Sequence, residues 1–151
     1  MVMDFYNKIA IASDHAGFEL KKTLIDYLHT SKISIFDLGC DSLDSCDYPD
    51  FGFRLAKAIE NKVMGILICG SGIGMSIAAN RFKHIRAALC HTTEQAKLAR
   101  QHNNANVLVL ASRFITAEYA IEIIKAFMET EFEGGRHEKR VEKLSDIGGE
   151  L

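Results

Sequence analysis

The stretch from Gly65 to Arg81, which reads GILICGSGIGMSIAANR, combines a thiol with three alternating glycines. Its first five residues, up to Cys69, form an apolar run suited to a strand buried on both faces, and a helical pattern begins at Ile73. Between the two, the glycines would leave main-chain N–H groups unpaired near the positive end of a helix, where anions bind. The spacing therefore predicts an anion-binding turn with Cys69 at its mouth.

Other interpretations of this turn remain open. The glycines follow G-x-G-x-G rather than the dinucleotide-binding G-x-G-x-x-G, because Met75 occupies the place of the third glycine, and a Walker lysine is absent. A tight strand-to-helix turn without a ligand is simpler, although three alternating glycines provide more backbone freedom than one turn normally requires. Cys69 is either a small core residue, as free cysteines usually are, or a reactive thiol favoured by the helix end beside it.

Polar side chains elsewhere could serve the same site. Asp14 and His15 follow an apolar run, where Asp14 could equally cap a helix, whereas a histidine ring at a strand end points to a ligand crevice. His102 ends a helical pattern just before another apolar run, where it could simply be a partner of the helix dipole.

Two arginines in the polar C-terminal segment form a second candidate group. Arg136 and Arg140 are four residues apart, so one helix would present both guanidinium groups on one face, where they could bind a phosphate. The more common alternative is a solvated charged face shared with Glu138 and Glu142.

The elements that must position these groups follow from hydrophobic periodicity. Apolar runs predict strands at 8–13, 33–38, 65–69, 85–89 and 106–110, and amphipathic patterns predict helices at 18–29, 51–61, 73–82, 92–102 and 116–130. This alternation predicts a single α/β domain over 1–151, a Rossmann-like three-layer αβα sandwich around a five-stranded parallel sheet. Ligands then bind beyond the carboxyl ends of the strands.

Finer expectations concern single elements. Ile73, Ile77 and Ala78 share one face of the helix that follows the glycine turn. Thr92 or Thr93 should cap the fourth helix, and Ala120, Ile123, Ile124 and Phe127 should face inward from the fifth. The only proline, Pro49, falls in a stretch from 40 to 50 that reads as loop, and the segment from residue 131 reads as a polar tail.

Composition narrows the class of protein. The formal net charge of −2 gives no indication of a nucleic-acid partner. No secretory signal and no apolar run of the ~18 residues that a membrane span needs are present, so we expect no membrane association. The four cysteines lack a C-x-x-C pair, which favours a cytoplasmic protein with reduced thiols. Neither H-x-x-x-H nor G-x-S-x-G occurs, so the sequence carries no metal-ligand spacing and no hydrolase elbow.

Taken together, the motifs resemble the ribose-5-phosphate isomerase type B family, which also includes galactose-6-phosphate isomerase subunits and allose-6-phosphate isomerase. The resemblance spans essentially the whole chain, in the order SDHAG (13–17), DYPD (47–50), CGSGIGMSIAANR (69–81), RQHNNANVL (100–108), SRF (112–114) and GGRHEKRVEKL (134–144). It implies an aldose–ketose isomerase that interconverts ribose 5-phosphate and ribulose 5-phosphate through an enediolate, without a metal or other cofactor. A hexose-6-phosphate substrate, galactose or allose phosphate, is the alternative.

The resemblance also implies residue roles. Cys69 as thiolate is the base, because some family members use a glutamate where this chain has Met75, while His102 and Ser71 assist the opening of the sugar ring. The N–H groups of the glycine turn hold the enediolate. The implied substrate-binding residues are Asp14, His15, Tyr48, Gly70, Gly72, Ile73, Gly74, Asn103, Arg113, Arg136 and Arg140, of which His15 and the last two bind the phosphate.

Family members are at least dimers with shared active sites, so the resemblance implies a homodimer or a dimer of dimers. In that arrangement Cys69 faces His102 of the neighbouring subunit, and the tail from about 131 to 151 contributes to the neighbour's site. A third hypothesis from a different class is a flavodoxin-like or nucleotide-binding module, which uses the glycine turn for a phosphate without chemistry. Such a module would have no need of Cys69 together with His102 and Ser71.

Overall fold

Five parallel strands form the centre of the fold, which is known here from a computed structural model that describes residues 6–146. The strands are β1 (Lys8–Ser13), β2 (Ser34–Asp37), β3 (Val63–Cys69), β4 (Ala87–Leu89) and β5 (Val107–Ala111). They lie in the order β2-β1-β3-β5-β4, and every neighbouring pair is parallel. All seven residues of β3 are buried, which confirms the burial predicted for 65–69, and the strand begins two residues earlier than predicted.

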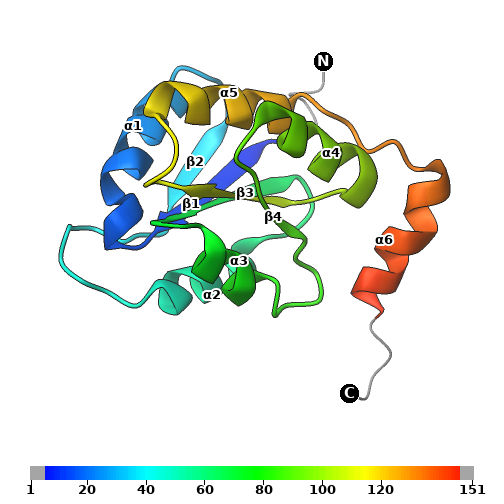
Figure 1. Cartoon of the computed structure of the whole chain (residues 1–151), viewed down its shortest axis with the longest axis horizontal. Helices are drawn as coiled ribbons and strands as arrows, with labels where there is room; N and C mark the ends of the chain where they lie inside the picture. The colour runs from blue at the N-terminus through cyan, green and yellow to red at the C-terminus, as the bar shows by residue number, and fades with distance from the viewer. Residues whose placement is uncertain (1–5, 147–151) are drawn as a thin grey trace.

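Helices cover both faces of this sheet (Figure 1). Their bounds are α1 (Phe18–Leu28), α2 (Tyr48–Ala58), α3 (Ile73–Ala79), α4 (Thr93–Asn103), α5 (Ala117–Met128) and α6 (Glu138–Ser145), with short 3-10 turns η2 (His15–Gly17) and η3 (Gly135–His137). Helices α1, α4 and α5 bury their apolar sides on one face, and α2 and α3 on the other. The predicted three-layer αβα sandwich with a five-stranded parallel sheet is confirmed.

The pleat of the strands divides the core into two layers. Alternate residues of β3, such as Ile66 and Ile68, pack under α1, α4 and α5, whereas Leu67 and Cys69 pack under α2 and α3. The predicted inward face of α5 is confirmed, since all four of its residues are buried. Thr92 is the cap of α4, where its hydroxyl accepts the N–H of Gln95 at 3.1 Å.

Three features of the helices differ from what the sequence pattern indicated. Helix α2 begins at Tyr48 rather than at 51, because Pro49 fits the first helical turn, where a missing N–H costs nothing. Ile73 and Ile77 are 57% and 58% exposed, and α3 instead buries Met75, Ala78 and Ala79. The close approach of α2 explains this choice, since a Cβ added at Gly52 would lie 3.1 Å from Ala78.

The C-terminal segment is the third difference. Residues predicted as a polar tail contain η3 and α6, and α6 stands away from the sheet at the side of the molecule opposite the tips of the strand arrows (Figure 1). Arg136 lies in η3 and Arg140 in α6, so the two do not share one continuous α-helix. The last five residues of the predicted tail lie outside the described residues. No helix in the described range is long and apolar enough to cross a membrane.

Candidate active site

The carboxyl ends of β1, β3 and β5 carry the first group of predicted site residues. From β1 the chain passes to β2 on one side and to β3 on the other, so the sheet changes its winding direction between β1 and β3, the place where ligands bind in sheets of this kind. Cys69 ends β3 there and is 5% exposed. We call this group the thiol half-site; it consists of Asp14, His15, Tyr48, the turn from Cys69 to Gly74, and Arg113.

Because two glycines of the turn lack a side chain, Arg113 and Tyr48 of the same half-site can pack against its main chain. A Cβ at Gly70 would lie 2.9 Å from Cζ of Arg113, and one at Gly74 would lie 2.7 Å from the ring of Tyr48. Gly72 has φ of +75° and would clash with Leu89 if it carried a side chain. The alternating glycines are therefore explained by close contacts with Arg113 and Tyr48 as well as by the turn itself.

Arg113 lies directly against this turn. Its main-chain N–H donates to the carbonyl of Gly70 at 3.1 Å, and the next residue back, Ser112, donates to the carbonyl of Cys69 at 3.0 Å. The guanidinium group lies against Gly70, two residues before the N-cap of α3 at Gly72, and brings a positive charge to the turn. Ser71 Oγ accepts the N–H of Ile73 at 3.2 Å, which leaves the hydroxyl proton of Ser71 free to be donated.

Asp14 and His15 follow β1 at the same edge. Oδ1 of Asp14 accepts the N–H of Gly17 at 3.1 Å, so the interpretation of Asp14 as a helix cap is confirmed. Nδ1 of His15 lies 3.2 Å from the N–H of Cys46 and accepts its hydrogen bond. The proton of a neutral His15 ring is then on Nε2, where it can be donated to an anion.

Cys46 is a contact that the sequence did not reveal, because 31 residues separate it from His15 and no motif links them. Its thiol lies 3.8 Å from Nδ1 of His15. Burial, more than any neighbouring group, raises the pKa of this thiol, so Cys46 is protonated at neutral pH. It contributes a main-chain donor to the half-site rather than a thiolate.

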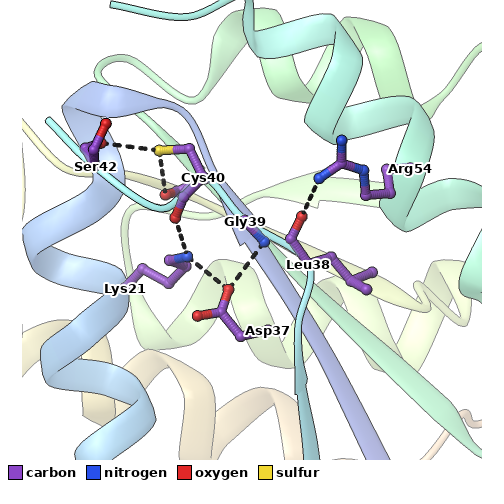
Figure 2. A network of polar contacts seen from close by, with 8 residues as sticks. Lys21, Asp37, Leu38, Gly39, Cys40, Ser42 and Arg54 are labelled. Atoms are coloured by element: carbon purple, nitrogen blue, oxygen red, sulfur yellow. Dashed lines mark hydrogen bonds and ion pairs between the residues drawn. The ribbon is translucent and has the colours of Figure 1, made fainter. Parts of the chain in front are cut away.

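A buried lysine, Lys21, holds the chain where it leaves β2 (Figure 2). The loop that begins there carries Cys46 and leads to Tyr48. Nζ of the fully buried Lys21 donates to Oδ1 of Asp37 and to the carbonyl of Cys40, each at 2.6 Å. The same carboxylate oxygen accepts the N–H of Gly39 at 3.0 Å. The network fixes the exit from β2, and the carbonyl of Gly39 in turn accepts the N–H of Ser13 at 2.7 Å, beside Asp14.

The remaining predicted residues, His102, Asn103, Arg136 and Arg140, gather at the end of α4. Together with Glu133 and His137, which contact His102, they form what we call the tail half-site. His102 lies in the last turn of α4, and its ring stacks on the ring of His137 with centroids 4.3 Å apart and planes at 14°. Oε1 of Glu133 is 3.6 Å from Nε2 of His102. No sequence pattern marked Glu133 or His137, since their contacts depend on how the chain returns after α5.

The histidines of this half-site differ in their surroundings. Burial, then the neighbouring His102, then Arg136 lower the pKa of His137, which favours its neutral form at pH 7. Nε2 of this ring can accept the Nε–H of Arg136, 3.4 Å away. His102, Glu133 and His137 offer ligand atoms within 4.8 Å of one another, although the sequence spacing showed no metal motif. However, stacked, nearly parallel rings do not aim their in-plane lone pairs at one point, so this arrangement fits a stacked pair better than a metal site.

The two half-sites lie at opposite ends of the parallel strands: the thiol half-site at their carboxyl ends and the tail half-site near their amino ends. Helix α4 runs back across the sheet to its amino edge, and β5 starts only four residues after Asn103. In Figure 1 the arrow of β5 points away from α6. Between residues 6 and 146, no hydrogen bond, ion pair or ring contact joins one half-site to the other. One chain therefore brings Cys69 together with Ser71 and Arg113, but not with His102 or the tail arginines.

Comparison with known proteins identifies the relatives of this arrangement. The model of the ribose/galactose isomerase family matches residues 9–144. The chain belongs to the ribose/galactose isomerase family. A ribose-5-phosphate isomerase B from Escherichia coli (strain K12) is 42% identical over 93% of this chain and 95% of its own length. A probable ribose-5-phosphate isomerase B from Mycoplasma pneumoniae is 48% identical over 94% of this chain and 95% of its own length.

Solved structures agree with this membership of the ribose/galactose isomerase family. The ribose-5-phosphate isomerase B of Mycoplasma genitalium with bound ribulose-5-phosphate superposes with a TM-score of 0.91 at 45% identity, covering 95% of this chain and 97% of that one. A ribose 5-phosphate isomerase from Thermotoga maritima gives 0.89 at 52% identity, covering 92% and 97%. The family resemblance inferred from the six motifs is confirmed.

Two cavities of the protein lie away from Cys69. One of about 610 Å³ at the amino edge is lined by Arg86, Arg100 and lysines, but its guanidinium groups serve the main chain. Arg100 donates to the carbonyl of Ala105 at 2.6 Å, and Arg86 to that of Asn104 at 2.9 Å. A second cavity, of about 400 Å³, borders the tail half-site at Asn103 and reaches α6.

Proposed function

We propose that the chain is a ribose-5-phosphate isomerase, which interconverts ribose 5-phosphate and ribulose 5-phosphate by moving a proton between C2 and C1. The observation that carries the proposal is the position of Cys69, a thiol at the mouth of the glycine turn with the Arg113 guanidinium over Gly70. Relatives 42% and 48% identical bear this name, and the solved relative from Mycoplasma genitalium has ribulose-5-phosphate bound.

In the proposed mechanism Cys69 as thiolate removes the proton from C2 of the open-chain aldose and returns it to C1. The enediolate oxygen that forms in between is negatively charged, and the N–H groups of Gly70, Gly72 and Gly74 would hold it, while the N–H of Ile73 is donated to Ser71 Oγ. Such a donor is worth roughly 3 kcal/mol of transition-state stabilisation when it is well placed. Met75 is fully buried in α3 and cannot accept a proton, which leaves Cys69 as the base of this turn.

The sugar arrives as a closed furanose, so the ring must open before the proton can move. We assign this step to His102 and Ser71, whose imidazole and free hydroxyl proton can exchange protons with the ring oxygen and the anomeric hydroxyl. The phosphate would bind to His15, through its Nε2–H, and to Arg136 and Arg140. Arg113, Asp14, Tyr48 and Asn103 would line the space between the two ends of the substrate.

Since the two half-sites of one chain lie at opposite ends of the strands, a complete site requires a second copy of the chain. We propose a homodimer, alone or paired into a dimer of dimers, in which the tail half-site of each subunit completes the thiol half-site of the other. Exposed apolar side chains support a partner surface, namely Ile73 and Ile77 on α3 and Leu144 on α6. We place this enzyme in the cytoplasm, where its four free thiols would remain reduced.

A mixing experiment tests the shared site. Cys69→Ala and His102→Asn are each expected to be nearly inactive as homodimers. In a mixed dimer one site carries both substitutions and the other carries neither. Random reassociation of equal amounts should therefore restore about a quarter of wild-type activity, since half of the dimers are mixed and each has one intact site. Absence of any recovery, with mixed dimers confirmed by native mass spectrometry, contradicts the shared site.

The substrate itself is tested by kcat/KM on ribose 5-phosphate, galactose 6-phosphate and allose 6-phosphate, with a chelator present throughout. We expect the five-carbon substrate to be preferred. A preference for either six-carbon phosphate would keep the family and the chemistry but overturn the proposed substrate.

A further inference from the structure

His102 is in contact with two titratable side chains that the proposed mechanism does not use. Its Nε2 faces the carboxylate of Glu133 at 3.6 Å, and one face of its ring is covered by His137. The side chains of His102 and Glu133 are 38% and 49% exposed, whereas His137 is only 6% exposed. An exposed histidine would otherwise sample several rotamers, so these contacts restrict where its nitrogens point.

Main-chain bonds anchor Glu133 at this position. The N–H of Glu133 donates to the carbonyl of Gln101 at 3.1 Å, and Arg100 donates to the carbonyl of Thr130 at 3.1 Å. These two hydrogen bonds tie the segment after α5 to the last turn of α4 at two points. The main chain of Glu133 is therefore fixed beside the end of α4, within reach of Nε2 of His102.

The glycine pair 134–135 brings His137 under the same ring. Both glycines have positive φ, +65° and +54°, and the N–H of His137 donates to the carbonyl of Gly134 at 3.0 Å. This sharp reversal returns the chain beneath His102. The distal nitrogen of His137 then lies 3.4 Å from Nε of Arg136, so one ring links the imidazole of His102 to a proposed phosphate-binding guanidinium.

We propose that Glu133 and His137 are positioning residues that orient the imidazole of His102 for opening of the furanose ring. The inference rests on the proposed function and deepens it. In ring opening the C1–O4 bond breaks and its electron pair leaves with O4, which gains a proton, while the anomeric hydroxyl loses one. Both protons move over hydrogen-bond distances, so a displaced imidazole slows this step without affecting proton removal by Cys69.

The two substrates of the reaction separate these steps. Ribose 5-phosphate closes through O4 and must be opened. Ribulose 5-phosphate cannot close a five-membered ring, because the oxygen it would need, O5, carries the phosphate. Exchange of the C1 proton of ribulose 5-phosphate with deuterated solvent therefore requires Cys69 and the glycine turn but no ring opening.

The experiment compares both reactions in the full-length dimer, with chelator present. Glu133→Gln and His137→Ala should lower kcat on ribose 5-phosphate about tenfold, while C1 exchange of ribulose 5-phosphate stays within about twofold of wild type. His137→Phe retains a ring to stack on His102 but loses the contact with Arg136, so it should recover kcat and raise KM. Glu131→Gln and His29→Ala are matched controls, since both side chains are exposed and lie outside both half-sites.

An equal fall in both reactions, or no fall in either, overturns the positioning role. Gel filtration and thermal unfolding of each variant identify any that fail to fold or to dimerise, and His137→Phe then provides the decisive comparison. Failure of the proposed function looks different, because the wild-type protein would then exchange no C1 proton of ribulose 5-phosphate at all.

Discussion

The thiol half-site and the tail half-site are built in different ways. Cys69 and its glycine turn continue directly from a buried strand, and main-chain bonds and glycine contacts leave little room for movement. The tail half-site rests on an end of α4 and a short polar helix, and its contacts are largely between side chains. The difference suggests that the proposed proton transfer uses the rigid edge of the sheet, while ring opening and phosphate binding use a part that a second subunit must complete.

The largest expected effect comes from removing the thiol. Cys69→Ala should lower kcat on ribose 5-phosphate and the C1 exchange of ribulose 5-phosphate by about 10³-fold, because a general base contributes on that scale. Cys90→Ala is the matched control, a buried thiol whose pKa burial raises to about 12. Near-normal turnover by the Cys69 variant would show that the rigid half-site does not contain the base.

Adding one methyl group to each half-site sharpens the comparison. Gly70→Ala would force its Cβ against the guanidinium of Arg113, and we expect about a 10²-fold loss of kcat/KM. Gly135→Ala meets no atom within 4 Å and carries only the strain of a positive φ, about 1 kcal/mol, so a loss of a few-fold is expected. Steady-state kinetics of the two variants decide, and equal losses would mean that both half-sites are packed with similar tolerance.

The buried lysine tests how far the rigid half-site depends on its support. Lys21→Met leaves the Asp37 carboxylate and the Cys40 carbonyl without their donor, and should lower the free energy of unfolding by about 2 kcal/mol. The value is moderate because Asp37 is half-exposed and water can replace the ammonium group. Urea unfolding measures it, with the exposed Lys22→Met as control; a change of less than 0.5 kcal/mol, roughly the scale of surface substitutions, would contradict the prediction.

The smallest effect is a pH dependence confined to the tail half-site. The pKa of His137 is lowered in the folded protein, so the folded form disfavours the protonated ring. Its contribution to stability is complete above the unfolded value of about 6.5 and is lost as the pH falls below it. The charged groups around it are His102, Arg136, Arg140 and, with opposite sign, Glu133.

Hydrogen exchange can detect this effect directly. Amides of the segment 133–140 should lose protection between pH 7.5 and 5.5, after correction for the intrinsic exchange rate, while amides of β3 keep theirs. His137→Asn, which does not titrate, should remove the difference. Loss of protection in β3 as well would indicate global unfolding and contradict a local response.

Much of the fold could be predicted because it depends on local pattern. The apolar run of β3 and the amphipathic face of α5 follow from periodicity, and the cap at Thr92 follows from residue type. The burial of α3 could not be predicted from its own isoleucines, because the close approach of α2 at Gly52 decides which side faces inward. The Pro49 loop was a related error, since a proline is compatible with both a loop and a first helical turn.

For the candidate site, too, local pattern predicted some residues, and contacts between distant segments decided the rest. Motifs pointed to Cys69, His15 and His102, which lie at the end of β3, just after β1 and in the last turn of α4. They could not reveal Cys46 beside His15 or His137 beneath His102, because those contacts arise from loops whose course the sequence pattern does not specify. They also could not show that one chain holds the two groups at opposite ends of its strands.

That separation of the half-sites has a consequence for how the protein would respond to dilution. If each site combines residues of two copies, an isolated subunit has no complete active site and therefore no activity. Specific activity should then fall with protein concentration along the dimer dissociation curve, whatever the substrate level. In a cell, the flux through this reaction would then depend on the fraction of subunits that are assembled into dimers.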